Sequence, residues 1–447
     1  MINIFKKLFG RKARPKGNYD IGLRVVDGEV TRQHVEISKE RRTMHVALLG
    51  KSGSGKSSLL RYLSQQDINA ERGFVYFDLH GDATPFLLRT IAAREQEIGR
   101  HLSNKLIVVA PADPEISVGF NPLDDDSRGF VRIGEIAEVL KARWHLDSFG
   151  ARTDELLRNS LFVLSANGLT LLELAPFLSH SGFRAQCLKQ VLNAEVRQYF
   201  ELRYDQASEA MRATMREALL NKTSAFTADP HFRHIIGQTQ STFSIPDAMD
   251  QGHWVIVNLE KGRLGEHALS LGSLIFTVLK NALFTRETRS LYTVYCDEIQ
   301  NLIAYGSGLE TVLSEARKFG VAVVSANQFL DQYPAEMRAA ILAMGTHAFF
   351  QLSSLDAAHV AQALDGGKSL AERLKNLPQR HCVVKSGPDR WIEVQVPLVR
   401  TPQVDYNGLR NRSRYEHGRL RANIERDIAK RQEAFSRTTD DILKEWE

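Results

Sequence analysis

Short runs of apolar residues recur along this chain and predict β-strands. The runs are rich in Val, Ile, Leu and Phe, and they are continuous rather than alternating, which is typical of strands covered on both faces. They read HVALLG at 45–50, FVYFDL at 74–79, LIVVAP at 106–111, WVIVNL at 254–259, YTVYCD at 292–297, VAVVSAN at 321–327 and HAFFQL at 347–352. Helical patterns, as at 57–66 and 309–319, separate several of the runs. This alternation predicts an α/β fold with a mainly parallel sheet.

The stretch from 124 to 248 interrupts the alternation, because it contains no convincing strand pattern. Ile133 and Ala137 recur at helical spacing, and Thr170 with Glu173 forms the signature of a helix capping box. We therefore expect an all-helical insertion within the α/β domain. The predicted organisation is a basic arm and lead-in at 1–40, the first part of the α/β domain at 41–123, the helical insertion at 124–248, the second part of the α/β domain at 249–400 and a charged, helical tail at 401–447.

The composition is that of an ordinary multidomain globular chain. It has 447 residues, of which 43% are hydrophobic and 25% are charged, and these shares exclude a wholly disordered, collagen-like or coiled-coil protein. Lys and Arg outnumber Asp and Glu by 58 to 53. That excess allows a nucleic-acid partner where the positive charge is clustered, but it does not by itself indicate one.

Cysteine usage and hydropathy favour a reducing, cytoplasmic location. The three cysteines, Cys187, Cys296 and Cys382, are far apart and fit neither a disulfide framework nor a zinc site. There is no secretory signal pattern, and no uninterrupted apolar window is long enough to span a bilayer. The nearest candidate, 268–284, contains Lys280, so we interpret it as a buried helix.

Residues 1–16 form a basic segment with six Lys or Arg side chains, no acidic residue and several large apolar residues. Two interpretations stay open. The segment is either a solvated arm, or a short amphipathic anchor that binds DNA or makes a peripheral contact with the inner face of an anionic membrane.

The strongest motif is GKSGSGKS at 50–57, which matches the pattern G-x-x-x-x-G-K-[ST] and lies between a predicted strand and a predicted helix. Glycines let the backbone wrap closely around phosphates, so that successive N–H groups and the start of the helix point at anionic oxygens. We expect Lys56 to reach the β- and γ-phosphates of ATP and the Ser57 hydroxyl to bind Mg²⁺. The predicted nucleotide-binding residues are Gly50, Lys51, Ser52, Gly53, Ser54, Gly55, Lys56, Ser57 and Ser58.

Acidic and amide side chains follow two of the later strands. Asp297 and Glu298 end the strand at 292–297, and Gln328 follows the strand at 321–327. Ligands of open α/β sheets bind at the carboxyl ends of the strands. We therefore expect Asp297 to hold Mg²⁺, Glu298 to polarise the attacking water, and Gln328 to contact the γ-phosphate or that water. The alternative for Asp297 and Glu298 is that both acids cap the following helix near its positive end. The alternative for Gln328 is that its amide bonds to the local backbone.

Arg317 is the candidate for an arginine that one subunit supplies to the nucleotide site of its neighbour. It lies in LSEARKFG at 313–320, and a guanidinium offered to the nucleotide of a neighbouring subunit would act as an arginine finger. The alternative is a surface arginine that pairs with Glu315 or another acid nearby.

In this order, the motifs resemble those of the conjugative coupling proteins of type IV secretion, within the HerA–FtsK superfamily of P-loop DNA motors. The segments that carry the resemblance are ERRTMHVALLGKSGSGKSSLL, FVYFDLHGD, GFNPLD, AFTADPHFRHIIGQ, VNLEKGRLGE, YCDEIQN and SEARKFGVAVVSANQ. The resemblance implies a RecA-like P-loop NTPase with an inserted helical domain. It also implies a homohexameric ring that hydrolyses ATP at subunit interfaces and pulls DNA through a central channel. By position it assigns nucleotide, Mg²⁺ and arginine-finger roles to Lys56, Ser57, Asp297, Glu298, Gln328 and Arg317.

Some features depart from the family pattern. Membrane-bound relatives begin with transmembrane helices and HerA proper begins with a β-barrel, and neither is expected here. SANQ stands where Ala-Thr-Gln is commoner. In the second-strand signature Asp78-Leu79-His80-Gly81-Asp82, leucine stands where proline is frequent.

The leading hypothesis is a cytoplasmic, ring-forming ATPase that translocates DNA without reading its sequence. It would act in conjugative transfer, with a relaxase or other secretion proteins as partners. Basic loop residues would hold the phosphates of DNA, and the candidates are Arg41, Arg42, Lys261 and Arg263. Three alternatives stay open: an ATPase of protein secretion, a nucleotide-gated scaffold at a membrane, and a HerA-type defence ATPase.

Overall fold

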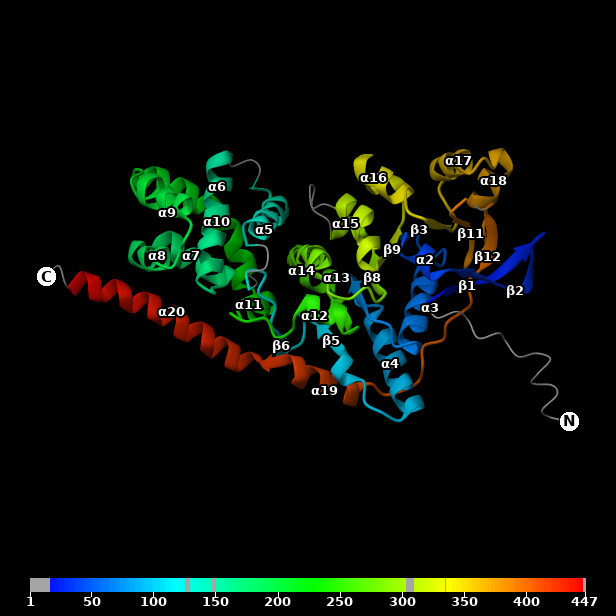
Figure 1. Cartoon of the computed structure of the whole chain (residues 1–447), viewed down its shortest axis with the longest axis horizontal. Helices are drawn as coiled ribbons and strands as arrows, with labels where there is room; N and C mark the ends of the chain where they lie inside the picture. Colours follow the sequence, from blue (N-terminus) through cyan, green and yellow to red (C-terminus); the bar gives the residue numbers. More distant parts are fainter. Residues whose placement is uncertain are drawn as a thin grey trace. The chain divides into compact units, whose positions relative to one another are not determined.

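The chain forms two compact units, and each combines segments that are distant in the sequence (Figure 1). Unit 1 contains 1–72, 291–295 and 313–400, and unit 2 contains 73–290, 296–312 and 401–447. The basic segment 1–16 lies outside the described residues. The computed structural model describes residues 17–124, 129–146, 150–302, 309–333, 335–388 and 390–444.

Unit 1 is built on a mixed sheet with the strand order β2-β1-β12-β11-β10-β3-β9-β8. The strands of its parallel part are β3 (Val46–Leu49), β8 (Tyr292–Asp297), β9 (Val321–Asn327) and β10 (Thr346–Phe349). β3 pairs in parallel with both β9 and β10. The Tyr292 N–H donates to the carbonyl of Gly320, just before β9, so β8 starts beside β9 and runs in the same direction. All four strands correspond to continuous apolar runs in the sequence.

An antiparallel part extends the sheet of unit 1 beyond β10. Its strands are β1 (Tyr19–Val26), β2 (Glu29–Ile37), β11 (His381–Ser386) and β12 (Ile392–Gln395). The apolar runs do not predict these strands. β2 is largely exposed, so polar residues interrupt its pattern.

Helices accompany the sheet of unit 1. They are α2 (Lys39–Arg42), α3 (Lys56–Asn69), α16 (Ala335–Leu342), α17 (Ser354–Ala363) and α18 (Gly367–Lys375). Leu370 and Leu374 of α18 share one buried apolar cluster with Leu49 of β3 and Val383 of β11. The helix pair α17–α18 is therefore anchored on the same sheet that carries the phosphate-loop motif.

Unit 2 contains parallel strands in the order β4-β7-β5. Their bounds are β4 (Phe74–Asp78), β5 (Leu106–Val109) and β7 (Trp254–Asn258). Each of the three corresponds to an apolar run in the sequence. The parallel strands of the two units confirm the predicted α/β fold with a mainly parallel sheet.

The most apolar helix of unit 2 is α14 (Glu266–Thr285). Among the described helices it is the one long and apolar enough to cross a membrane, but 83% of its apolar window is buried inside the protein. Lys280, within this helix, pairs with Glu135 over 2.9 Å. The interpretation of 268–284 as a buried core helix is therefore confirmed.

The described residues between β6 (Ile116–Val118) and β7 form helices and no strand. The α-helices there are α5 (Gly129–Arg143), α6 (Ala151–Ala166), α7 (Leu174–Ser179), α8 (Ser181–Leu188), α9 (Ala194–Gln198), α10 (Glu209–Ala228), α11 (Pro230–Ile236) and α12 (Ile245–Asp250). The capping box of Thr170 and Glu173 is confirmed and precedes α7. The boundaries of this stretch as a domain of its own stay a prediction.

The C-terminal segment runs along unit 2 and joins its strands to its helices (Figure 1). Its elements are α19 (Asn407–His417), β13 (Gly418–Leu420) and α20 (Arg421–Lys444). Helix α4 (Thr84–Ile98) belongs to the same unit. β13 pairs with β6 in antiparallel register. Arg412 of α19 pairs with Glu95 of α4 over 2.7 Å, and Glu425 of α20 pairs with Arg233 of α11 over 3.2 Å.

Arg42 is completely buried in unit 1, so its assignment to a DNA-contacting loop is wrong. Its guanidinium donates to Asp67 over 3.1 Å and to the Thr293 hydroxyl over 3.0 Å, and it lies 3.3 Å from the centre of the Tyr19 ring. A guanidinium enclosed in this way holds the interior of the unit together and cannot reach an external phosphate.

His45, just before β3, makes the stability of unit 1 sensitive to pH. Only 3% of it is exposed. Its Nδ1 accepts the Val323 N–H over 3.0 Å, and its Nε2 donates to the Leu313 carbonyl over 2.8 Å. Burial lowers the pKa of His45 from 6.5 to about 4. Because the folded state favours the neutral imidazole, the stabilisation is complete above pH 6.5 and is lost as the pH falls towards 4.

We expect this residue to remove about 3 kcal/mol of unfolding free energy between pH 6.5 and pH 4. Urea denaturation at a series of pH values measures the change. The His45→Gln protein should lose this part of the pH dependence, whereas His359→Gln, at an exposed position of α17, should keep it. Equal pH profiles for His45→Gln and the unmodified protein would contradict the assignment.

Candidate active site

The phosphate-loop motif occupies the turn between β3 and α3 in unit 1. The loop begins directly after Leu49, the last residue of β3, and Gly55 is the N-cap of α3, which starts at Lys56. The first N–H groups of a helix have no intrahelical partner and are available to an anion. The structure thus places the motif in the strand–loop–helix context that its sequence predicts.

Arg380, just before β11, closes one side of this loop. Gly55 has a φ of 120°, and a Cβ there would lie 2.8 Å from the Cα of Arg380, so only glycine fits. The Arg380 N–H donates to the Ser54 carbonyl over 2.8 Å, and the Gln379 amide donates to the Gly53 carbonyl over 3.2 Å. No local motif marks Gln379 or Arg380 as part of the site, because both come to the loop only through the fold.

The last residue of β9 and the segment that follows β10 close the other side of the loop. The Gly50 N–H donates to the Asn327 carbonyl over 3.1 Å, and the Lys51 N–H donates to the Gln351 carbonyl over 2.8 Å. Gln328 directly follows Asn327 in the chain. Gln328 is thus one residue away from this backbone contact, and its own contact with the γ-phosphate or the attacking water stays a prediction.

Lys56 and Ser57 present different polar groups at the start of α3. Lys56 is 7% exposed, and its Nζ donates to the carbonyls of Gly50 and Lys51 over 2.5 and 3.0 Å. Ser57 is exposed and Ser58 is half-buried. An ammonium group at the centre of the loop and an exposed hydroxyl on the first helical turn fit a triphosphate with Mg²⁺.

Asp297 and Glu298, in unit 2, stand at the carboxyl end of β8. Asp297 is the last residue of the strand, and Glu298 follows with φ 56° and ψ 55°. A left-handed backbone is uncommon for a residue other than glycine, and such residues cluster at functional sites. Glu298 Oε2 accepts the Asn301 amide over 2.8 Å and lies 3.8 Å from His80 Nε2. The approach of the two carboxylates to the phosphate loop stays a prediction.

Asp78 organises the turn that presents His80. Its carboxylate accepts the N–H groups of Gly81 and Ala83, each over 3.0 Å. It also accepts the N–H and the hydroxyl of Thr84, each over 2.7 Å. Asp78 therefore caps the start of α4, and the second-strand signature has a structural role in this turn.

Arg317 lies on the surface of unit 1 in the short helix η6 (Ala316–Phe319). Its side chain is exposed and forms no ion pair with any described residue. Glu315, the partner considered from the sequence, pairs instead with Lys318 over 2.6 Å. The Arg317 guanidinium is therefore accessible to a second molecule.

Two further basic residues proposed for DNA contact lie in α13 (Lys261–Leu264) of unit 2. Lys261 pairs with Glu266 over 3.2 Å, and Arg263 pairs with Glu260 over 3.6 Å. Partly exposed pairs of this kind contribute little to stability, so a polyanion can compete for both side chains. Their contact with DNA stays a prediction.

The cysteines have no chemical part in the site. All three are free and buried. Burial raises the pKa of Cys187 to about 12 and holds the pKa values of Cys296 and Cys382 well above the ordinary range, so none is a reactive thiolate at neutral pH. The part of the chain that the structure describes contains no group of three or more His, Cys, Asp or Glu that could hold a metal ion.

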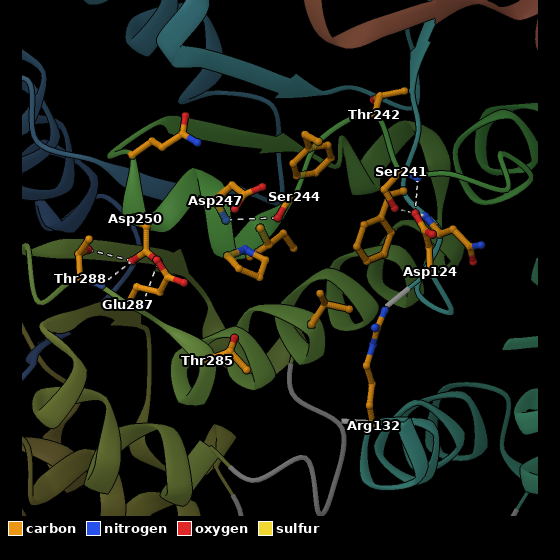
Figure 2. A pocket seen from close by; sticks show the side chains of 17 residues that line it. Asp124, Arg132, Ser241, Thr242, Ser244, Asp247, Asp250, Thr285, Glu287 and Thr288 are labelled. Carbon is orange, nitrogen blue, oxygen red and sulfur yellow. Dashed lines mark hydrogen bonds between the residues drawn. The ribbon is translucent and has the colours of Figure 1, made fainter. Parts of the chain in front are cut away.

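A cavity of about 830 Å³ in unit 2 contains none of the predicted site residues (Figure 2). Its carboxylates support the surrounding walls. Asp250 accepts the Glu287 N–H over 3.1 Å and the Thr288 hydroxyl over 2.8 Å, and Asp124 accepts the Ser241 N–H over 2.6 Å (Figure 2). We assign this cavity no part in nucleotide chemistry.

The fold and the phosphate loop define a RecA-like P-loop NTPase. Residues 24–275, more than half of the chain, match the family model described as "Helicase HerA, central domain". The chain therefore belongs to this family, and the resemblance to the HerA–FtsK superfamily is confirmed.

Solved structures share this fold at low sequence identity. The plasmid coupling protein TrwB in complex with the ATP analogue ADPNP is 17% identical, with 90% of this chain and 94% of that chain covered and a TM-score of 0.58. TrwB with ADP and Mg²⁺ is 16% identical, with 88% and 98% covered and a TM-score of 0.58. VirB4 of Thermoanaerobacter pseudethanolicus is 11% identical, with 86% and 98% covered and a TM-score of 0.58. No curated protein matches the sequence.

Proposed function

We propose that this chain binds and hydrolyses ATP with Mg²⁺. The observation that carries the proposal is the phosphate loop, a glycine turn pinned by hydrogen bonds between β3 and α3, with Lys56 and Ser57 at the start of the helix. The positive end of the helix dipole and the N–H groups of the first helical turn favour anionic oxygens there. The structurally similar TrwB has been solved with ADPNP and with ADP and Mg²⁺, which supports a nucleotide as the ligand.

The site residues would divide the tasks of phosphoryl transfer to water. Lys56 would bind the β- and γ-phosphates, and Ser57 and Asp297 would hold the metal. Mg²⁺ supplies positive charge that offsets the negative charge of the phosphates. Glu298 would orient and polarise the attacking water, and Gln328 would contact the γ-phosphate or that water.

We further propose that hydrolysis drives the movement of DNA by a homohexameric ring, in conjugative transfer through type IV secretion. Membership of the HerA helicase family and the fold shared with the plasmid coupling protein TrwB support this role. A motor of this kind binds DNA through its phosphates without reading bases, so its affinity depends on salt. Arg317, exposed on unit 1, would complete the active site of the neighbouring subunit.

ATP turnover is expected to rise when DNA is added at low salt, and the stimulation is expected to fall between about 50 and 200 mM salt because phosphate contacts release counterions. Turnover is measured with and without DNA over a range of protein concentrations, with Lys56→Ala as the background control. A steep dependence on protein concentration would support sites shared between subunits. Turnover indifferent to DNA at low salt would contradict a DNA motor, and stimulation by a secreted partner alone would favour protein secretion.

A further inference from the structure

The carboxylate of Glu298 is held by a residue three positions further along the chain. The Asn301 amide donates to Glu298 Oε2 over 2.8 Å. The Asn301 N–H also donates to the Glu298 carbonyl over 2.9 Å, which closes the 3₁₀ turn η5 (Ile299–Asn301). Because Glu298 has a left-handed backbone, this turn and this amide set the direction of its side chain.

The main chain at Asn301 and Leu302 is in turn bound by side chains from two helices of unit 2. Arg143, the last residue of α5, donates through Nη2 to the Asn301 carbonyl. Its Nε donates to the hydroxyl of Ser273 in α14 over 2.9 Å, and Ser273 donates to the Leu302 carbonyl over 2.6 Å. The Asn301 carbonyl is therefore held by Arg143 of α5, and the next carbonyl, of Leu302, is held by Ser273 of α14.

We propose that Asn301 is a positioning residue for Glu298, and that Arg143 couples the helical stretch to it. The inference rests on the proposed role of Glu298 in polarising the attacking water. The Asn301 amide orients the carboxylate, and the Arg143 guanidinium holds the main chain that carries the amide. A movement of α5 is transmitted through these two hydrogen bonds to Glu298, so the helices between β6 and β7 control the rate of hydrolysis.

Two substitutions at Asn301 test the positioning. Asn301→Ala removes the amide and is expected to lower kcat about tenfold to a hundredfold, with KM for ATP unchanged. Asn301→Asp keeps the size of the side chain but sets a second carboxylate against Glu298. Because like charges repel at this distance, its kcat is expected to be lower still. If Asn301 only maintained the fold, Asn301→Asp, which keeps the size of the side chain, would not have a lower kcat than Asn301→Ala.

Arg143→Lys tests the link to α5. Lysine keeps the positive charge but cannot bind the Asn301 carbonyl and the Ser273 hydroxyl in the fork geometry of a guanidinium, so kcat is expected to fall about tenfold with KM unchanged. Arg203→Ala is the matched control: Arg203 is an arginine of the same helical stretch, paired with Glu155 over 2.6 Å. It is expected to keep wild-type rates. Thermal unfolding of each variant identifies any loss of fold.

The outcomes separate this inference from the proposed function. A Glu298→Gln protein without activity, together with Asn301 variants at or above the wild-type kcat, would overturn the inference alone. A Glu298→Gln protein with wild-type turnover would overturn the proposed role of Glu298, and the inference with it. A fall in kcat for Asn301→Ala, a deeper fall for Asn301→Asp and a smaller fall for Arg143→Lys would support both.

Discussion

Replacing Lys56 with alanine is expected to reduce ATP turnover by about a hundredfold or more. The Lys56 Nζ is held by the carbonyls of Gly50 and Lys51 over 2.5 and 3.0 Å, so its charge is already positioned at the centre of the loop. A buried charge placed in advance stabilises the developing charge of the γ-phosphate without the cost of reorganisation. Steady-state hydrolysis and the binding of a fluorescent ATP analogue measure the loss.

Lys51→Ala is the matched control for this experiment. Lys51 belongs to the same predicted nucleotide-binding loop, but it takes part in the loop through its backbone, whose N–H donates to the Gln351 carbonyl over 2.8 Å. Alanine keeps that bond, so turnover near the wild-type value is expected. Wild-type turnover in the Lys56→Ala protein would refute the phosphate loop as the active site.

Arg317→Ala is expected to bind ATP with unchanged affinity and to hydrolyse it about 10³–10⁵ times more slowly. This loss corresponds to roughly 4–7 kcal/mol of barrier. The Arg317 side chain is exposed on unit 1 and has no ion pair among the described residues, so its charge is available to the nucleotide of another subunit. Single-turnover hydrolysis and equilibrium binding of ATP separate the two effects.

Mixing Arg317→Ala with Glu298→Gln subunits tests whether the arginine acts across an interface. Each variant alone is expected to be inactive, whereas mixed assemblies contain interfaces that combine an intact Glu298 with an intact Arg317. Some activity should therefore return on mixing. Lys318→Ala, which changes the adjacent basic residue that pairs with Glu315, should hydrolyse ATP normally. No recovery at any mixing ratio would show that Arg317 acts within its own subunit or takes no part in hydrolysis.

The strands that the sequence predicts are those whose signal is local. A strand covered on both faces is apolar along its whole length, so β3, β4, β5 and β7 to β10 are visible as continuous runs. The phosphate loop is equally visible, because its glycine spacing, Lys56 and Ser57 are consecutive in the chain. The capping box at Thr170 and Glu173 is another signal of this kind, since its partners are three residues apart.

The elements that sequence patterns miss depend on partners far away in the chain. β2 lies at the end of the sheet of unit 1 and is largely exposed, so its polar residues hide the strand pattern. The sequence suggests that Arg42 is a basic residue of an exposed loop. In the structure its guanidinium is buried and donates hydrogen bonds to Asp67 and Thr293. A buried ion pair leaves no trace in the local pattern, because each partner alone looks like a surface residue.

The order of residues along the chain was enough to identify the P-loop class, since a backbone cradle for phosphate is made by neighbouring residues. Which distant side chains support that cradle was decided by the strand order of the sheet. Only the fold brings the backbone of Arg380 close to Gly55 and places the Asn327 carbonyl where it accepts the Gly50 N–H. It likewise carries Arg143 to Asn301. These contacts join residues separated by whole elements, and only burial of their shared apolar surfaces brings them within bonding distance.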